Sequence, residues 1–227
     1  MIGCNYDIKF DLNPNCPKRN KIKYSVYLVL KRIFDILFFV IGLICLSPVF
    51  LVVAIIIRTS DKGPAFYSHK RIGLNGKEIK IYKFRSMVKD SDNLDKWLNQ
   101  KQKESLKNEF KVVNDPRITK FGHFLRKSSI DEIPQLFNVL IGNLSLIGPR
   151  PIVRKELENY GNCVNKLLCV KPGLTGYWQA YARNNVTYEN GERQSMELYY
   201  IDHQSLWLDI KIFFKTIVTV INKDGAE

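Results

Sequence analysis

The chain has 227 residues, 45% of them hydrophobic, so it can form one large domain or a domain with a membrane anchor. Its 35 Lys and Arg residues outnumber 22 acidic residues, and the net charge of +13 favours an anionic partner: a nucleic acid, a phospholipid surface or a phosphorylated substrate. The five cysteines contain no C-x-x-C pair, which argues against a zinc site and a disulfide framework and predicts reduced thiols in a cytosolic setting.

Residues 33–57 form an apolar run, IFDILFFVIGLICLSPVFLVVAIII, in which Asp35 is the single charged residue. As a helix the run would be about 37 Å long at about 1.5 Å per residue, enough for a hydrocarbon core of about 30 Å. A cleaved signal peptide is not expected, because a long polar segment precedes the run and no small-residue cleavage site ends it. One ordinary membrane-spanning helix is therefore one interpretation.

Two features favour a helix that enters the membrane and returns to the same side. Basic residues flank both ends of the run, so the positive-inside rule gives no orientation. Near its middle, Pro48 lacks the N–H that would pair with the carbonyl of Ile44, so we expect a bend there. The hydroxyl of Ser47 can bond to the carbonyl of Leu43 or Ile44 and satisfy it. On these residues alone, both topologies stay open.

The stretch after the anchor, AFYSHKRIGLNGKEIKIYKFRSM, predicts a β-hairpin near residues 66–84. Asn75-Gly76 lies between two strand-like runs, which is typical of a type I′ turn. The hairpin carries many basic residues, Lys83 and Arg85 among them. They either bind an anion or form a solvated face.

Three further segments predict local structure. Residues 89–111 are rich in charge and predict an exposed helix or a loop with helical turns. LSLIGPRPIV predicts a rigid turn that directs the side chain of Arg150. The segment 206–221, LWLDIKIFFKTIVTVI, predicts an amphipathic helix that either packs on the core or lies on a membrane surface. Its apolar stripe consists of Trp207, Ile210, Phe214, Ile217 and Ile221.

Two adjacent carboxylates, Asp131 and Glu132, lie in the sequence SSIDEIPQL. In a purely structural interpretation, Ser129 and Glu132 form a capping box at a helix start. In a functional one, the helix N-terminus keeps Asp131 ionised as a nucleophile toward phosphorus, while Glu132 binds Mg²⁺. A diphosphate substrate would also need basic residues to neutralise its charge. The candidates for this role are Arg85, Arg126 and Arg150.

Six stretches occur together and in order: KRIFDI before the interrupted apolar run, KFRSM, DPRITKFGHFLRKSSIDEIPQLFNVL, LSLIGPRP, KPGLTGYWQ and LYYIDHQSLWLDIKIFFKT. On these stretches the chain resembles the bacterial sugar transferases known as monotopic phosphoglycosyl transferases, or polyprenyl-phosphate hexose-1-phosphate transferases. The resemblance covers residues 31–218. With one hydrophobic segment in 227 residues, the chain resembles the minimal form of the family.

The resemblance implies an α+β fold, mainly helical, with amphipathic interfacial helices around a compact cytoplasmic catalytic domain. It implies a re-entrant membrane helix bent at Ser47 and Pro48, and a monotopic protein on the cytoplasmic face of the bacterial inner (plasma) membrane. The expected organisation is a basic N-terminal segment at 1–30, the re-entrant helix at 31–58 and the catalytic domain at 59–227.

The resemblance also implies an activity: transfer of a sugar 1-phosphate from a UDP-sugar to polyprenyl (undecaprenyl) phosphate, with release of UMP. This would be the first membrane step of surface glycan assembly, such as exopolysaccharide biosynthesis. Asp131 matches the nucleophile that forms a phosphosugar intermediate, and Glu132 matches the Mg²⁺ ligand. The expected partners are the two substrates and membrane lipids, not nucleic acid, and a homodimer is an option. The expected substrate-binding residues are Lys83, Arg85, Arg126, Arg150 and Arg183.

Two other functions stay open: a membrane-anchored glycosyltransferase that releases UDP, and a non-enzymatic basic module that binds membranes. Three positions depart from the family pattern, which more often has Leu at 133, an acid at 143 and Asp at 197. Here they are Ile133, Asn143 and Glu197. No stretch of the sequence indicates which sugar is transferred or which glycan is made.

Overall fold

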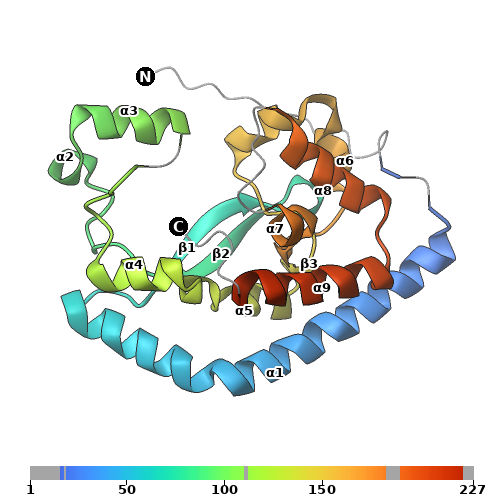
Figure 1. Cartoon of the computed structure of the whole chain (residues 1–227), viewed down its shortest axis with the longest axis horizontal. Coiled ribbons are helices and arrows are strands. Elements are labelled where there is room, and N and C mark those ends of the chain that lie inside the picture. Colours follow the sequence, from blue (N-terminus) through green and yellow to red (C-terminus); the bar gives the residue numbers. More distant parts are fainter. Residues whose placement is uncertain (1–15, 18, 110–111, 183–189, 222–227) are drawn as a thin grey trace. The chain divides into compact units, whose positions relative to one another are not determined.

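A computed structural model describes residues 16–17, 19–109, 112–182 and 190–221 (Figure 1). The described part is mostly helical, and its strands form two sheets of two strands each, as the predicted α+β class requires. The chain forms two compact units. Among the described residues, the first comprises 16–17, 19–41, 70–81, 136–182 and 190–221, and the second comprises 42–69, 82–109 and 112–135.

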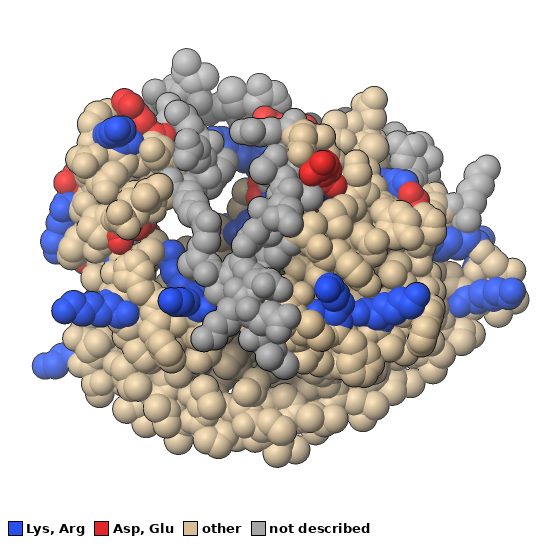
Figure 2. All heavy atoms as spheres, viewed as in Figure 1, with Lys and Arg blue, Asp and Glu red and all other residues tan. Residues whose placement is uncertain are grey.

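The long helix α1 runs without interruption from Lys21 to Asp61 and contains Pro48. It begins ahead of the predicted start at residue 31, so part of the expected N-terminal segment is helical. The Ser47 hydroxyl donates to the carbonyl of Ile44 at 3.1 Å, which confirms the predicted back-bond. Among the described helices, α1 is long and apolar enough to cross a membrane, judged by length and composition. In Figure 2 no charged side chain lies over its middle.

A β-hairpin follows α1 and confirms the prediction for residues 66–84. Strands β1 (Phe66–Ile72) and β2 (Glu78–Phe84) pair, and the short helix η1 (Leu74–Gly76) forms their connection. Asn75 and Gly76 have φ values of 56° and 72°, and the Lys77 N–H donates to the carbonyl of Leu74 at 3.2 Å. Positive φ at both central positions is the type I′ geometry that was predicted.

The second unit has a core of aromatic and aliphatic side chains from α1, the hairpin and α4. Phe84 and Leu125 are buried there with Val53 and Ile57, and the ring centroids of Phe50 and Phe84 are 4.9 Å apart. Its helices are α2 (Leu94–Trp97), α3 (Gln100–Glu109), α4 (Lys120–Lys127) and η2 (Ile130–Glu132). Helices α2 and α3 lie within residues 89–111, as the charge pattern there predicted.

The first unit is built around a parallel pair of short strands, β3 (Ser145–Ile147) and β4 (Gly173–Thr175). Its core includes Ile147, Leu157, Tyr200, Ile201 and Ile212, all almost fully buried. The surrounding helices are η3 (Arg154–Cys163), α6 (Val164–Leu168), α7 (Tyr177–Tyr181), α8 (Glu192–Asp202) and α9 (Leu206–Ile221), and α5 (Gln135–Leu140) precedes β3.

Three charged residues near the start of the apolar run attach α1 to the first unit. Lys31 Nζ lies 2.7 Å from Asp209 Oδ2, and Arg32 donates to the carbonyls of Val139 and Leu140 at 2.6 Å each. Asp35 accepts from the Ser145 hydroxyl at 3.0 Å and from the Leu146 N–H at 2.8 Å. These contacts explain how an aspartate can be buried in an otherwise apolar run.

Helix α9 packs on the core of the first unit, which is one of the two predicted alternatives. Its inner side packs on the first unit through Asp209 and Ile212, which are buried. Trp207, Ile210 and Phe214 of the predicted apolar stripe are instead exposed, so the stripe is not the packing face.

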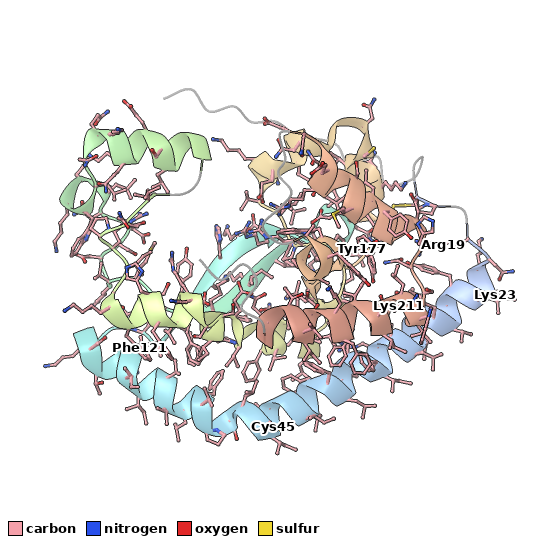
Figure 3. The ribbon with its side chains drawn as sticks, in the orientation of Figure 1. Arg19, Lys23, Cys45, Phe121, Tyr177 and Lys211 are labelled. Atoms are coloured by element: carbon pink, nitrogen blue, oxygen red, sulfur yellow. A yellow bond between two sulfur atoms is a disulfide. The ribbon has the colours of Figure 1, made fainter. Side chains whose placement is uncertain are left out.

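The prediction of reduced thiols throughout the chain is wrong. Cys16 and Cys169 form a disulfide, with their Cα atoms 5.9 Å apart. The two residues are 153 positions apart in the sequence, so only the tertiary fold shows that their side chains meet. Cys45 and Cys163 are free, and Figure 3 labels Cys45 on α1, where it is exposed.

Candidate active site

The adjacent carboxylates lie on η2, directly after α4. Thr119 caps the start of α4 by accepting from the Gly122 N–H at 2.8 Å, and Leu125 anchors the helix in the core of the second unit. The chain then reverses through Ser129, which has a φ of 56°. Asp131 is thereby buried, while Glu132 keeps 44% of its side chain exposed.

The predicted capping box is wrong, because the Ser129 side chain makes no cap hydrogen bond. A capping serine normally has an extended backbone, whereas Ser129 is left-handed. The helical segment that follows is a single 3₁₀ turn over Ile130–Glu132. A capping box therefore does not account for the adjacent carboxylates of Asp131 and Glu132.

Burial raises the pKa of the Asp131 carboxyl above its usual value. The positive charges of Lys83 and Arg126 oppose this rise, and the negative charge of Glu132 adds to it. The net shift is upward because the loss of hydration outweighs the favourable charges of Lys83 and Arg126. A buried carboxyl with a perturbed pKa beside specific charges is a candidate for a functional group.

Lys83 of β2 contacts both carboxylates. Its Nζ lies 2.6 Å from Glu132 Oε1 and 3.7 Å from Asp131 Oδ2. Successive side chains of a strand point to opposite faces, so Phe84 enters the core while Lys83 points away from it. The structure thus brings together three of the predicted site residues: Lys83, Asp131 and Glu132.

Arg126 lies on the last turn of α4, close enough to Asp131 for their charges to interact. Its Nε donates to the Ser86 hydroxyl at 2.9 Å. Burial lowers the pKa of Arg126, and the charges of Asp131 and Asp115 oppose that shift. Arg85 also belongs to the second unit, where its guanidinium packs against Gly63.

Ser86 and Gly122 are two residues of this site that the sequence analysis did not identify. The Ser86 carbonyl accepts from the Thr119 N–H at 3.1 Å, which joins the strand end to the start of α4. A Cβ atom at Gly122 would lie 1.9 Å from the Ser86 carbonyl oxygen, so only glycine permits this approach. A glycine inside a helical pattern was the available signal.

Arg150 belongs to the first unit, and its loop is held by two glutamates. Its N–H donates to Glu197 Oε1 at 3.3 Å, and its Nη1 lies 3.5 Å from Glu156 Oε1. Glu197, one of the departures from the family pattern, is buried and also accepts from the hydroxyl of Tyr160. Burial raises the pKa of Glu197. Arg183 lies outside the described residues.

The donor set of the second unit fits Mg²⁺ when a substrate supplies further ligands. In the described part of the chain, no group of three or more His, Cys, Asp or Glu side chains could hold a metal ion. Asp131 and Glu132 nevertheless offer two adjacent carboxylates, and Mg²⁺ commonly takes one or two together with water and substrate phosphates. The exposed part of Glu132 makes it the more accessible ligand of the two.

Comparison with known proteins gives a family and several close relatives. The family model described as bacterial sugar transferase matches residues 26–223. The chain is 46% identical over 200 residues to the undecaprenyl-phosphate galactose phosphotransferase of Salmonella typhimurium. It is 44% identical over 200 residues to the UDP-galactose-lipid carrier transferase of Erwinia amylovora. It is 42% identical over 199 residues to the exopolysaccharide production protein ExoY of Sinorhizobium fredii.

These matches cover most of the present chain but different shares of the relatives. The alignments include 87%, 87% and 86% of this chain, respectively. They span 41% of the Salmonella and Erwinia proteins but 87% of the Sinorhizobium protein. The family match over residues 26–223 includes the Asp131–Glu132 pair, the hairpin and most of the long apolar helix. The chain belongs to the bacterial sugar transferase family.

Proposed function

We propose that the protein transfers a sugar 1-phosphate from a UDP-sugar to polyprenyl (undecaprenyl) phosphate and releases UMP. Membership of the sugar transferase family supports this proposal, as do relatives named for undecaprenyl phosphate and for UDP-galactose. The observation that carries it is the buried Asp131 beside Glu132, with Lys83 Nζ 3.7 Å away. A non-enzymatic module that binds anions through Lys and Arg side chains would not need a buried carboxylate among them.

In the proposed first step, a carboxylate oxygen of Asp131 attacks the phosphorus that bears the sugar. A bond forms between this oxygen and phosphorus, and the bond from phosphorus to the bridging oxygen breaks, so UMP leaves with the electron pair. In the second step, a phosphate oxygen of the polyprenyl phosphate attacks the same phosphorus and releases the Asp131 carboxylate. Lys83 and Arg126 stabilise negative charge near the reacting phosphate. Mg²⁺, with Glu132 as a ligand, would supply further neutralisation of the diphosphate.

We further propose that α1 is re-entrant and that the protein lies on the cytoplasmic face of the inner membrane. Two sequence features support this topology over a simple span. Basic residues flank both ends of the apolar run, so neither end is marked as the outer one. Pro48 lies near the middle of the run, where a bend is expected.

Intact-protein mass spectrometry tests the covalent step. With the UDP-sugar that supports UMP release and Mg²⁺, but without acceptor, we expect a sugar-phosphate adduct on the wild type and on the control Asp95→Asn, and none on Asp131→Asn. Asp95 is an almost fully exposed acid of the second unit, so replacing it should not change adduct formation. Because the sugar is undetermined, a panel of UDP-sugars should be screened first for UMP release.

Turnover without an adduct on the wild type would overturn the covalent mechanism. Release of UDP in place of UMP would favour the membrane-anchored glycosyltransferase. An absence of turnover for every sugar, with tighter anion binding by Asp131→Asn, would favour the binding module. For the topology, a tag at the N-terminus should stay inaccessible to a label added outside intact cells. Labelling of the tag from outside would instead favour a single membrane-spanning helix.

A further inference from the structure

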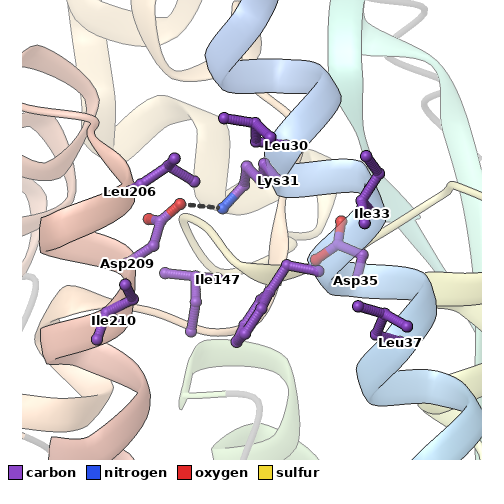
Figure 4. Close-up of a pocket in the computed structure, with 10 residues that line it drawn as sticks. Leu30, Lys31, Ile33, Asp35, Leu37, Ile147, Leu206, Asp209 and Ile210 are labelled. Atoms are coloured by element: carbon purple, nitrogen blue, oxygen red, sulfur yellow. Dashed lines mark hydrogen bonds and ion pairs between the residues drawn. The ribbon is translucent and has the colours of Figure 1, made fainter.

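A pocket of about 270 Å³ lies within the first unit between α1 and α9, with Ile147 of β3 also in its lining (Figure 4). Its walls are aliphatic and aromatic. The side chains that form them are Leu30, Ile33, Phe34 and Leu37 of α1 and Leu206 and Ile210 of α9. A concave apolar surface of this kind favours an apolar ligand, because filling it removes hydrocarbon from water.

The charged groups that line the pocket already have protein partners. Lys31 Nζ lies 2.7 Å from Asp209 Oδ2, and Asp209 also accepts from the hydroxyls of Tyr27 and Tyr200 at 2.8 and 2.7 Å. Asp35 accepts from the Leu146 N–H. A polar ligand would have to compete with these bonds, whereas a hydrocarbon chain would leave them intact.

The surroundings of the pocket have the features of a membrane–water interface. The pocket lies where the apolar run of α1 begins, directly after Lys31 and Arg32. On α9, Trp207 is 65% exposed, and its ring centroid is 5.2 Å from Lys211 Nζ. Figure 3 labels Lys211 on this helix. Exposed Trp and Lys side chains beside apolar surface are typical of the headgroup level of a bilayer.

We propose that this pocket holds an acyl chain of an anionic phospholipid from the membrane that α1 enters, with the headgroup near Lys211. None of the candidate phosphate-binding or reacting residues that the structure describes lines the pocket, which favours a bilayer lipid over the chain of the polyprenyl substrate. The proposal rests on membrane association and not on the transfer reaction. It can therefore fail while the proposed function stands.

Photolabelling in nanodiscs tests the proposal. The full chain is placed in nanodiscs of phosphatidylcholine and phosphatidylglycerol that contain a tracer phosphatidylglycerol with a diazirine in its acyl chain. Labelled sites are then mapped by peptide mass spectrometry. We expect labelling of residues 30–37 and 206–210 above that of Ile44, which is 70% exposed and reports contact with bulk lipid.

Ile210→Trp fills the pocket, and Ile217→Trp on the same helix is its matched control, because the two isoleucines are 38% and 40% exposed. Ile210→Trp should reduce labelling of residues 30–37 about tenfold, the loss expected when about two methylene groups lose their contacts. Ile217→Trp should not. If Ile210→Trp does not fold, Leu37→Trp on the opposite wall takes its place. Its control is Leu51→Trp, because Leu37 and Leu51 are similarly exposed, at 57% and 62%.

Three kinds of result would overturn the proposal. The first is labelling of residues 30–37 no stronger than that of Ile44, or an equal loss in the pocket variant and its control. The second is displacement of the label by an equimolar amount of polyprenyl phosphate, which would assign the pocket to the acceptor chain. The third is equal labelling by a phosphatidylcholine tracer in discs of phosphatidylcholine alone, which would refute the preference for an anionic headgroup.

Discussion

Replacing Lys83 with Met removes an ammonium group that lies 3.7 Å from Asp131 Oδ2 and 2.6 Å from Glu132 Oε1. Methionine keeps a stem of similar length, so the change is mainly one of charge. Lys83 lowers the pKa of Asp131 and thereby opposes the effect of burial. The variant should therefore raise this pKa further, and the charge of Glu132, no longer paired with Lys83, acts in the same direction.

The distance sets the size of the effect. Two unit charges 3.7 Å apart interact by about 1 kcal/mol at the dielectric constant of water and by about 4.5 kcal/mol at an effective value of about 20. The Lys83 side chain is 32% exposed and that of Asp131 is 11% exposed, so solvent screens part of the interaction. We therefore expect the lower part of this range, about 1.4 kcal/mol, which corresponds to about one pH unit.

The assay is the pH profile of kcat/KM for UMP release. Asp131 must be ionised to attack phosphorus, so activity should fall as the pH falls through its pKa. In Lys83→Met this acidic limb should move to higher pH, and in Lys80→Met, an exposed position of the same strand, it should stay in place. A limb that does not move in Lys83→Met, or that moves to lower pH, would refute the electrostatic reasoning.

Two other substitutions test the link between β2 and α4. Ser86→Ala removes the acceptor of Arg126 Nε, so kcat/KM should fall about fivefold, for a loss of about 1 kcal/mol. Ser195→Ala, an exposed serine of α8, is the control, and a parallel drop in Tm of the Ser86 variant would indicate a structural role instead. Gly122→Ala places a Cβ 1.9 Å from the Ser86 carbonyl oxygen and should lower the free energy of unfolding by about 2 kcal/mol. An unchanged Tm in thermal denaturation, with Lys120→Ala as the control, would contradict this.

Elements whose causes are local could be predicted from the sequence. The type I′ turn at Asn75-Gly76 follows from two residues that tolerate positive φ. The Ser47 back-bond follows from a hydroxyl placed three residues after a carbonyl that Pro48 leaves unpaired. In both cases, the groups that interact are within a few positions of one another.

The candidate site could be predicted only in part. Lys83, Asp131 and Glu132 were chosen from the sequence and do lie together. Ser86, whose hydroxyl holds Arg126, was missed, because a serine gives no signal of its partner 40 positions away. The capping box failed because Ser129 has a left-handed backbone and its side chain makes no cap hydrogen bond.

The local elements, the long apolar helix with Ser47 and Pro48 near its middle, and the chemical types at the paired carboxylates could be predicted from the sequence alone. Periodicity, turn residues and charge carry this information within short windows. Three features follow from the tertiary structure and not from local sequence. Lys83 contacts both carboxylates, burial raises the pKa of Asp131, and Cys16 bonds to Cys169. The exposure of the apolar stripe of α9 is a further such feature. The physical reason is that desolvation and long-range contacts depend on which distant segments pack together, which no short window of sequence records.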